Sequence, residues 1–342
     1  MKFVKWIALA IVLAITLTAV AASWAYNALT EPMMVSEKAT FDVKPGASII
    51  KLGHQLSERG WIQYPQLTRL AFKLDPTLVP KVGKYEIKPN MSLMDALALF
   101  DSGDTLFYPI TLLEGHTFRD YLAAMKAKGN IEMTLSELTD KQIAEKMGLE
   151  NNSPEGMLFA NTYRYHDGDT DLDIFMQANA LLEAALDKEW SGKAKDLPYK
   201  TPYEALIMAS IIEKETGVAD ERPLIARVFI SRLEKGMRLQ TDPTVIYGMG
   251  DRYKGNITRA DLRQHTPYNT YQINRLPPTP IANVGVEAIN AALNPGETKA
   301  LYFVAKGDGS HVFSNTLREH NNAVARYQRF QRRKDYTSAP TQ

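Results

Sequence analysis

The chain has 342 residues, which is enough for two domains and a terminal extension. Hydrophobic residues make up 45% of it and charged residues 23%, both ordinary values for a globular protein. The formal net charge of +1, together with the lack of a concentrated basic motif, gives no reason to expect a nucleic-acid partner. Zero cysteines exclude disulfides, thiol catalysis and cysteine-ligated zinc.

The N-terminal segment is predicted to cross a membrane. Residues 6–26 contain no charged side chain, and a helix of that length spans a bilayer core. Lys2 and Lys5 precede it, so we expect residues 1–5 in the cytoplasm, a single pass through the inner membrane, and the bulk of the chain in the periplasm. A cleaved signal peptide is the alternative, because residues 19–21 resemble a small-x-small cleavage site. We favour the uncleaved anchor because the apolar run continues past that site.

A small α+β module is predicted after a linker at residues 27–39. From 40 to 105 the pattern gives a strand, two helices, a second strand and a final helix. This order resembles the LysM-like module of wall-binding proteins. The residues that carry the resemblance are Pro45-Gly46-Ala47-Ser48 before the first helix and Gly83-Lys84-Tyr85 in the second strand.

A larger mixed α+β domain is expected at residues 106–330, so the whole chain is placed in the α+β class. Its clearest local signal is a hairpin, in which a strand at 301–305 pairs with a strand at 311–314 through a Gly-Asp-Gly turn. Residues 331–342 are expected to form a disordered tail.

One helix of this domain has sequence signals for both its start and its end. Thr201 can cap the first free amides, Pro202 suits the first helical position, and Glu204 is placed to complete a capping box. Gly217 is expected to end the helix as a left-handed stop.

Two carboxylates, Glu213 and Glu215, lie at the end of that helix. At about 100° per residue, Glu215 points the same way as the centre of the apolar arc, whereas Glu213 is expected to reach solvent. Burial without a cation raises the pKa of a carboxyl, and the negative end of the helix dipole acts in the same direction. This reasoning predicts a general acid at Glu215. An ion pair with a Lys or Arg at the helix end is the alternative.

Four motifs lie in this helix or after it in the sequence: Ala209–Thr216, Arg232–Gly248, Pro267–Tyr271, and Leu301–Val304 with His311–Phe313. Together with the N-terminal anchor they resemble the membrane-anchored endolytic murein transglycosylases, the YceG-like family. The resemblance implies that Glu215 is the acid/base glutamate. It also implies glycan-binding roles for a set of polar residues on proline-containing loops: Gln240, Asp242, Tyr247, Tyr268 and Asn269.

The implied reaction is cleavage of the MurNAc–GlcNAc β-1,4 bond in nascent peptidoglycan strands, with formation of a 1,6-anhydroMurNAc end. It needs one carboxyl group, which first donates and then accepts a proton, and it needs no cofactor. The six histidines show no His-Glu-x-x-His pattern, so no metal site is expected. The resemblance further implies that the protein works beside the glycan polymerases and terminates strand elongation.

Two other functions remain open from the sequence. The protein could be a non-catalytic peptidoglycan-binding scaffold in which Glu215 is structural. It could also be a muramidase-type hydrolase, if Asp242 faced Glu215 at the spacing that a water-using pair of carboxylates requires.

Overall fold

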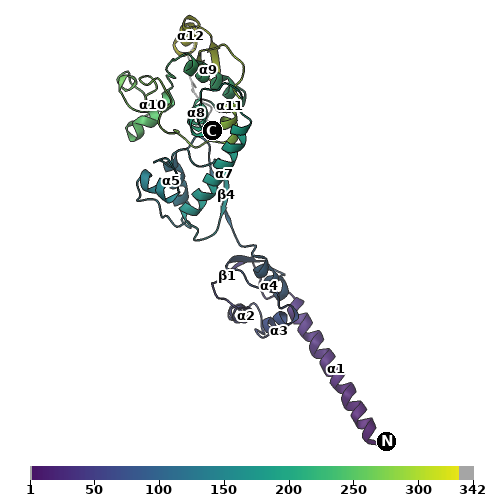
Figure 1. Cartoon of the computed structure of the whole chain (residues 1–342). Helices are drawn as coiled ribbons and strands as arrows, with labels where there is room; N and C mark the ends of the chain where they lie inside the picture. The colour runs from purple at the N-terminus through teal and green to yellow at the C-terminus, as the bar shows by residue number, and fades with distance from the viewer. Residues whose placement is uncertain (1, 331–342) are drawn as a thin grey trace. The chain divides into compact units, whose positions relative to one another are not determined.

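The computed structural model describes residues 2–330 and divides into two compact units, the first ending at Tyr108 and the second beginning at Pro109 (Figure 1). The class is mixed α+β, as expected, and the strands of the described part form three two-stranded sheets. The predicted tail at 331–342 lies outside the described residues.

The first unit begins with one long helix, α1 (Lys2–Thr30). By length and composition it could cross a membrane, and the span expected at 6–26 lies inside it. The elements that follow are β1 (Ala39–Val43), α2 (Ile49–Glu58), α3 (Leu67–Leu74), β2 (Gly83–Ile87) and α4 (Leu93–Ser102). The two strands pair antiparallel, with Phe41 opposite Tyr85.

The core of this unit is aromatic and aliphatic. The rings of Phe41 and Tyr85 each lie 5.1 Å from the ring of Phe100 on α4. Ser92 caps α4 by accepting a hydrogen bond from the Asp95 N–H, and the Asp95 carboxylate accepts one from the Ser92 N–H in return. This cap fixes the end of α4 that adjoins the segment after α1.

Residues 27–39, which the sequence suggested as a linker, are packed into the first unit. Helix α1 continues through Thr30, and Leu29, Met33 and Val35 are buried in the core. The Met33 N–H donates to the Met91 carbonyl at 2.8 Å. The apolar side chains that follow α1 therefore attach it to the unit, because their burial removes them from water.

The second unit contains the remaining elements. They are β3 (Tyr108–Leu112), which starts at the boundary, α5 (Phe118–Lys128), α6 (Asp140–Lys146), β4 (Asn161–Tyr165), α7 (Asp171–Ser191), α8 (Pro202–Glu215), α9 (Arg222–Glu234), α10 (Asp242–Met249), α11 (Val286–Leu293), β5 (Tyr302–Ala305), β6 (His311–Ser314) and α12 (Leu317–Val324). β3 pairs with β4, and β5 pairs antiparallel with β6, which confirms the predicted hairpin.

Helix α8 is the central element of the second unit. It packs against α7, α9, α10 and α11, and every residue from Ala205 to Glu213 is buried. Thr201 caps its first turn, as predicted, by accepting from the Glu204 N–H at 3.3 Å. The expected capping box is wrong, because the Glu204 carboxylate accepts from the Lys200 N–H instead.

The end of α8 also differs from the expectation. The helix stops at Glu215, and Thr216 closes it in an extended conformation with φ −148°, so Gly217 does not act as a left-handed stop. The chain then passes through a short 3₁₀ turn, Ala219–Glu221, into α9. Glu215 is thus the last helical residue, at the point where the helix emerges from the core.

Candidate active site

A cavity of about 900 Å³ opens at the C-terminal end of α8. Its lining comes from the ends of α8 and α9, the start of α10, the loop at 253–257, the β5–β6 hairpin and α12. Glu215 and Lys214 are the α8 residues that reach it. The size is typical of a site that holds a small molecule or part of a polymer.

Glu215 lies in the wall of this cavity with its side chain partly exposed. Its Oε1 accepts a hydrogen bond from the Thr241 hydroxyl. Burial raises the pKa of Glu215 to about 7, and the negative charge of Asp242 acts in the same direction. The Thr241 hydrogen bond and the charge of Arg232 oppose this rise. A carboxyl with a pKa near neutrality can both donate and accept a proton, as acid/base catalysis requires.

Glu213 is not the solvent-facing carboxylate that helix geometry predicted. It is only 7% exposed, and its Oε1 lies 3.5 Å from Nη2 of Arg222. Burial raises the pKa of Glu213 to about 7, against the opposing charge of Arg222. The expectation is wrong because α8 is covered on all sides, so the face it shares with Leu206 and Ser210 is also buried. Of these two carboxylates, only Glu215 lines the cavity.

Three of the five residues assigned to glycan binding line the same cavity: Gln240, Asp242 and Tyr247. The backbone of Gln240 has φ 54°, and its N–H donates to the Thr270 carbonyl at 3.2 Å. Asp242 opens α10, and its Oδ1 accepts from the Tyr271 hydroxyl at 2.7 Å. The structure therefore brings these three side chains together with Glu215.

Tyr268 and Asn269 are not among the cavity-lining residues. The Tyr268 hydroxyl lies 2.8 Å from the Thr279 hydroxyl, and its ring packs 4.9 Å from the ring of Tyr247. Asn269 is 1% exposed, and its side-chain amide donates to three backbone carbonyls between Asp261 and Gln264. Both residues support the loops behind the wall.

Arg232 is a cavity residue that sequence reasoning did not assign. Its guanidinium donates to the Leu301 and Leu239 carbonyls, each at 2.7 Å, and lies 5.1 Å from the ring centroid of Tyr302. It is buried, and its positive charge lowers the pKa of Glu215 by less than burial raises it. Because its partners are backbone carbonyls, no pairing pattern in the sequence could have revealed it.

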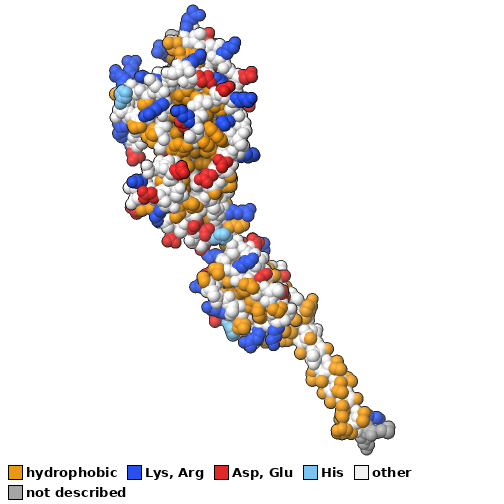
Figure 2. All heavy atoms as spheres, in the orientation of Figure 1, with side chains coloured by type: hydrophobic (Ala, Val, Ile, Leu, Met, Phe, Trp, Pro, Cys, Tyr) orange, Lys and Arg blue, Asp and Glu red, His pale blue; other side chains and the backbone are white. Residues whose placement is uncertain are grey.

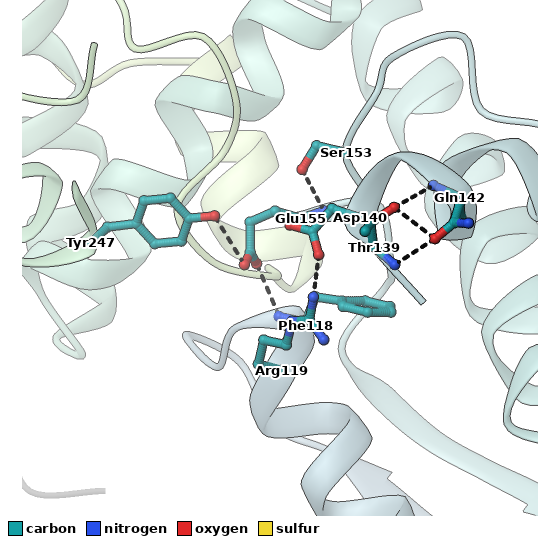
Figure 3. Close-up of polar contacts among 8 residues, drawn as sticks. All are labelled: Phe118, Arg119, Thr139, Asp140, Gln142, Ser153, Glu155 and Tyr247. Atoms are coloured by element: carbon teal, nitrogen blue, oxygen red, sulfur yellow. Dashed lines mark hydrogen bonds and ion pairs between the residues drawn. The ribbon is translucent and has the colours of Figure 1, made fainter. Parts of the chain in front are cut away.

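Glu155 is a second residue that the sequence did not assign. Figure 3 shows its carboxyl between Tyr247 and the start of α5. One oxygen accepts from the Phe118 N–H at 3.0 Å and the other from the Tyr247 hydroxyl at 3.2 Å. Glu155 is 5% exposed, and burial raises its pKa to about 7. It lies behind the wall to which Tyr247 belongs.

The side chains that line the cavity can transfer a proton and can bind a polar molecule. In the part of the chain that the structure describes, no group of three or more His, Asp or Glu side chains is placed to hold a metal ion. A carboxyl with a pKa near 7, in a cavity with amide, carboxylate, guanidinium and phenol groups, can act on a polar substrate such as a sugar chain.

Comparisons with known proteins agree with the motifs. A model of the YceG-like family matches residues 41–326. An endolytic murein transglycosylase of Bacillus subtilis (strain 168) is 31% identical over 325 residues, which cover 88% of each chain. Another, from Streptococcus pneumoniae serotype 2 (strain D39), is 27% identical over 323 residues, covering 84% of this chain and 58% of its own.

A crystal structure of a YceG-like protein from Listeria monocytogenes is 29% identical, with a TM-score of 0.48, and the match covers 84% of this chain and 99% of that one. The family model extends over both units, from β1 to α12. This chain therefore belongs to the YceG-like family.

Proposed function

We propose that this protein is an endolytic murein transglycosylase, a lyase that cuts peptidoglycan glycan strands within the chain. Family membership and the activity named for its relatives support the reaction class. The observation that carries the proposal is Glu215, a carboxyl with a pKa of about 7 at the wall of a cavity of about 900 Å³.

Glu215 serves as both acid and base in the proposed reaction. Its protonated carboxyl donates to the glycosidic oxygen of the MurNAc–GlcNAc β-1,4 bond, and the bond from that oxygen to C1 of MurNAc breaks. The resulting carboxylate accepts the proton of the MurNAc C6 hydroxyl, whose oxygen bonds to C1. The product has a 1,6-anhydro end, and no water is consumed.

The polar residues around Glu215 bind the glycan in this proposal. Gln240, Asp242 and Tyr247 contact the sugar directly, because they line the cavity beside the acid. Tyr268 and Asn269 contribute from behind by holding Tyr247 and the adjoining loop.

Helix α1 anchors the protein in the inner membrane, with its N-terminus in the cytoplasm and both units in the periplasm. Its length and the two lysines at its start support this orientation. The first unit, with its β1-α2-α3-β2 order, acts as a LysM-like module. An anchored cleaving site stays near newly made strands, so it works beside the glycan polymerases and terminates strand elongation.

Glu215→Gln tests the proposal on isolated sacculi, with Glu183→Gln as the matched control because Glu183 is an exposed residue of α7. The wild type and the control should release fragments with 1,6-anhydro ends, whereas Glu215→Gln should release none. Release by Glu215→Gln would remove Glu215 from the mechanism. A wild type that releases nothing would support the binding scaffold, and hydrolysed ends would support a muramidase that uses Asp242 as its second carboxylate.

A further inference from the structure

The start of α3 lies at the level where α1 would leave a membrane. From Lys5 to Trp24 a helix rises about 28 Å, close to the ~30 Å thickness of a bilayer's hydrocarbon core. The ring of Trp24 lies 5.0 Å from the ring of Tyr64, three residues before α3. Trp and Tyr rings gather at the membrane–water boundary, so this pair marks that boundary on the first unit.

Helix α1 is joined rigidly to the unit that carries α3. The helix is unbroken to Thr30, and the Glu31 N–H still donates to the Asn27 carbonyl at 2.7 Å. Leu29 is buried in the core of the unit, and α1 packs against both α3 and α4. The unit therefore keeps one orientation relative to α1.

The outer face of α3 has the chemistry of a surface that contacts phospholipids. At about 100° per residue, Gln66, Arg69 and Lys73 share one face, and all three are exposed. Residues 61–74 contain no acidic side chain. Figure 2 shows Lys and Arg side chains on the edge of this unit beside the emerging α1.

The residues next to this face of α3 also suit contact with a membrane. Phe72 and Leu74, on the same helix, are 44% and 67% exposed. The first acid after α3 is Asp75, and its carboxylate accepts from the Thr77 N–H at 3.0 Å and the Thr77 hydroxyl at 2.5 Å. That carboxylate is engaged within its own loop, so it does not pair with the basic side chains of α3.

We propose that this face of α3 rests on the phospholipid headgroup layer of the membrane that α1 crosses, where Arg69 and Lys73 contact lipid phosphates. The inference rests on the proposed membrane span of α1. It gives the first unit a second membrane contact besides the anchor, so that the unit lies against the bilayer in a fixed orientation.

Single labels on the full-length protein test this contact, because the chain contains no cysteine that would compete for the label. One nitroxide is placed at Leu13→Cys in α1, Gln66→Cys on the α3 face, or Asp104→Cys, an exposed position after α4. The protein is inserted into vesicles of phosphatidylcholine and phosphatidylglycerol. Collisions with oxygen, which dissolves in the bilayer, and with a water-soluble nickel chelate then report the depth of each label.

We expect the Leu13 label in the acyl chains, the Gln66 label at headgroup depth and the Asp104 label in water. Adding Lys73→Glu to the Gln66-labelled protein should lower the ratio of membrane-bound to water-exposed label, read from the two collision rates, by about fivefold or more. Each basic residue near an anionic surface strengthens binding by about that factor. Lys44→Glu, an exposed lysine after β1, is the matched control and should change nothing.

A Gln66 label as accessible to the nickel chelate as the Asp104 label, with Leu13 still in the acyl chains, would overturn the inference while leaving the membrane span intact. Equal effects of Lys73→Glu and Lys44→Glu would overturn it as well. A Leu13 label in water would instead show that α1 does not span the bilayer, and the inference would fail with the span.

Discussion

The Tyr247 hydroxyl donates a hydrogen bond of 3.2 Å to Glu155, so a residue of the cavity wall is fixed to a carboxyl behind it. The other oxygen of Glu155 accepts from the Phe118 N–H at 3.0 Å. Thr117, the residue before Phe118, lines the same cavity. Glu155 therefore ties α10 and the start of α5, two separate segments near the cavity, to each other.

Replacing Glu155 with glutamine should destabilise the protein. The glutamine amide group would face one of the two donors, and an unsatisfied buried donor costs about 1–3 kcal/mol. Urea unfolding should show a loss of that size, and Glu150→Gln, at an exposed position, should show none. Equal unfolding free energies for the two variants would contradict the bridging role of Glu155.

Activity should fall above neutral pH. A general acid must be protonated, and burial raises the pKa of Glu215 to about 7. Above that pH the protonated fraction falls about tenfold per pH unit. A profile of kcat/KM between pH 5 and 9 should show an alkaline limb with an apparent pKa near 7. A rate that rises over this range would show that Glu215 acts first as a carboxylate.

Two substitutions beside Glu215 should move that limb in opposite directions. The Thr241 hydrogen bond lowers the pKa of Glu215, so Thr241→Val should shift the limb to higher pH. The charge of Asp242 raises that pKa, so Asp242→Asn should shift it to lower pH. Each shift should be up to about one pH unit. Shifts of the same sign would mean that the limb belongs to another group.

Glu213→Gln should affect stability more than catalysis. The glutamine amide cannot reproduce both carboxyl oxygens beside Arg222, and a buried polar group left without its partner costs about 1–3 kcal/mol. Activity per folded molecule should be retained, since Glu213 does not line the cavity. Loss of activity in a fully folded Glu213→Gln protein would place Glu213 in the chemistry.

The stability loss in Glu213→Gln should also depend on pH. Burial raises the folded-state pKa of Glu213 to about 7 from an ordinary value of 4.5. The folded protein thus holds a proton that the unfolded chain releases, so the wild type loses stability as the pH rises between these values, whereas glutamine does not titrate. The difference between the two proteins should be larger at pH 5 than at pH 8.

Local chemistry predicted much of the fold. Thr201 and Pro202 set the start of α8 where the sequence placed it, and the Gly-Asp-Gly turn joins β5 to β6. The strand–helix–helix–strand order of the first unit could also be predicted, because each element has its own periodic pattern. These features depend on residues close together in the chain.

The environment of each carboxylate could not be predicted in this way. Helical periodicity separates a buried from an exposed face only when one face meets water. Helix α8 is covered by four other helices, so Glu213 and the residues on its side are buried too. Glu215 reaches the cavity because α8 ends at its wall. Much of the rest of that wall is formed by elements far away in the chain.

The roles of several polar residues near the cavity could not be predicted from the sequence either. Asn269 is a residue type expected in a sugar-binding loop, yet its side-chain amide donates to backbone carbonyls of its own protein. Arg232 and Glu155 act near the cavity through partners 69 and 92 residues away in the chain. Such pairings are set by tertiary packing, and no local spacing encodes them.

One carboxyl, that of Glu215, should be enough to cleave the strand without consuming water. The most direct measurement is mass spectrometry of fragments released from purified glycan strands in water enriched in the heavy oxygen isotope. The new ends should be 1,6-anhydro groups, lighter by one water than hydrolysed ends and free of heavy oxygen, and Glu215→Gln should release no fragments. Heavy oxygen at the new ends would mean that water takes part in the cleavage, and unchanged release by Glu215→Gln would mean that Glu215 does not.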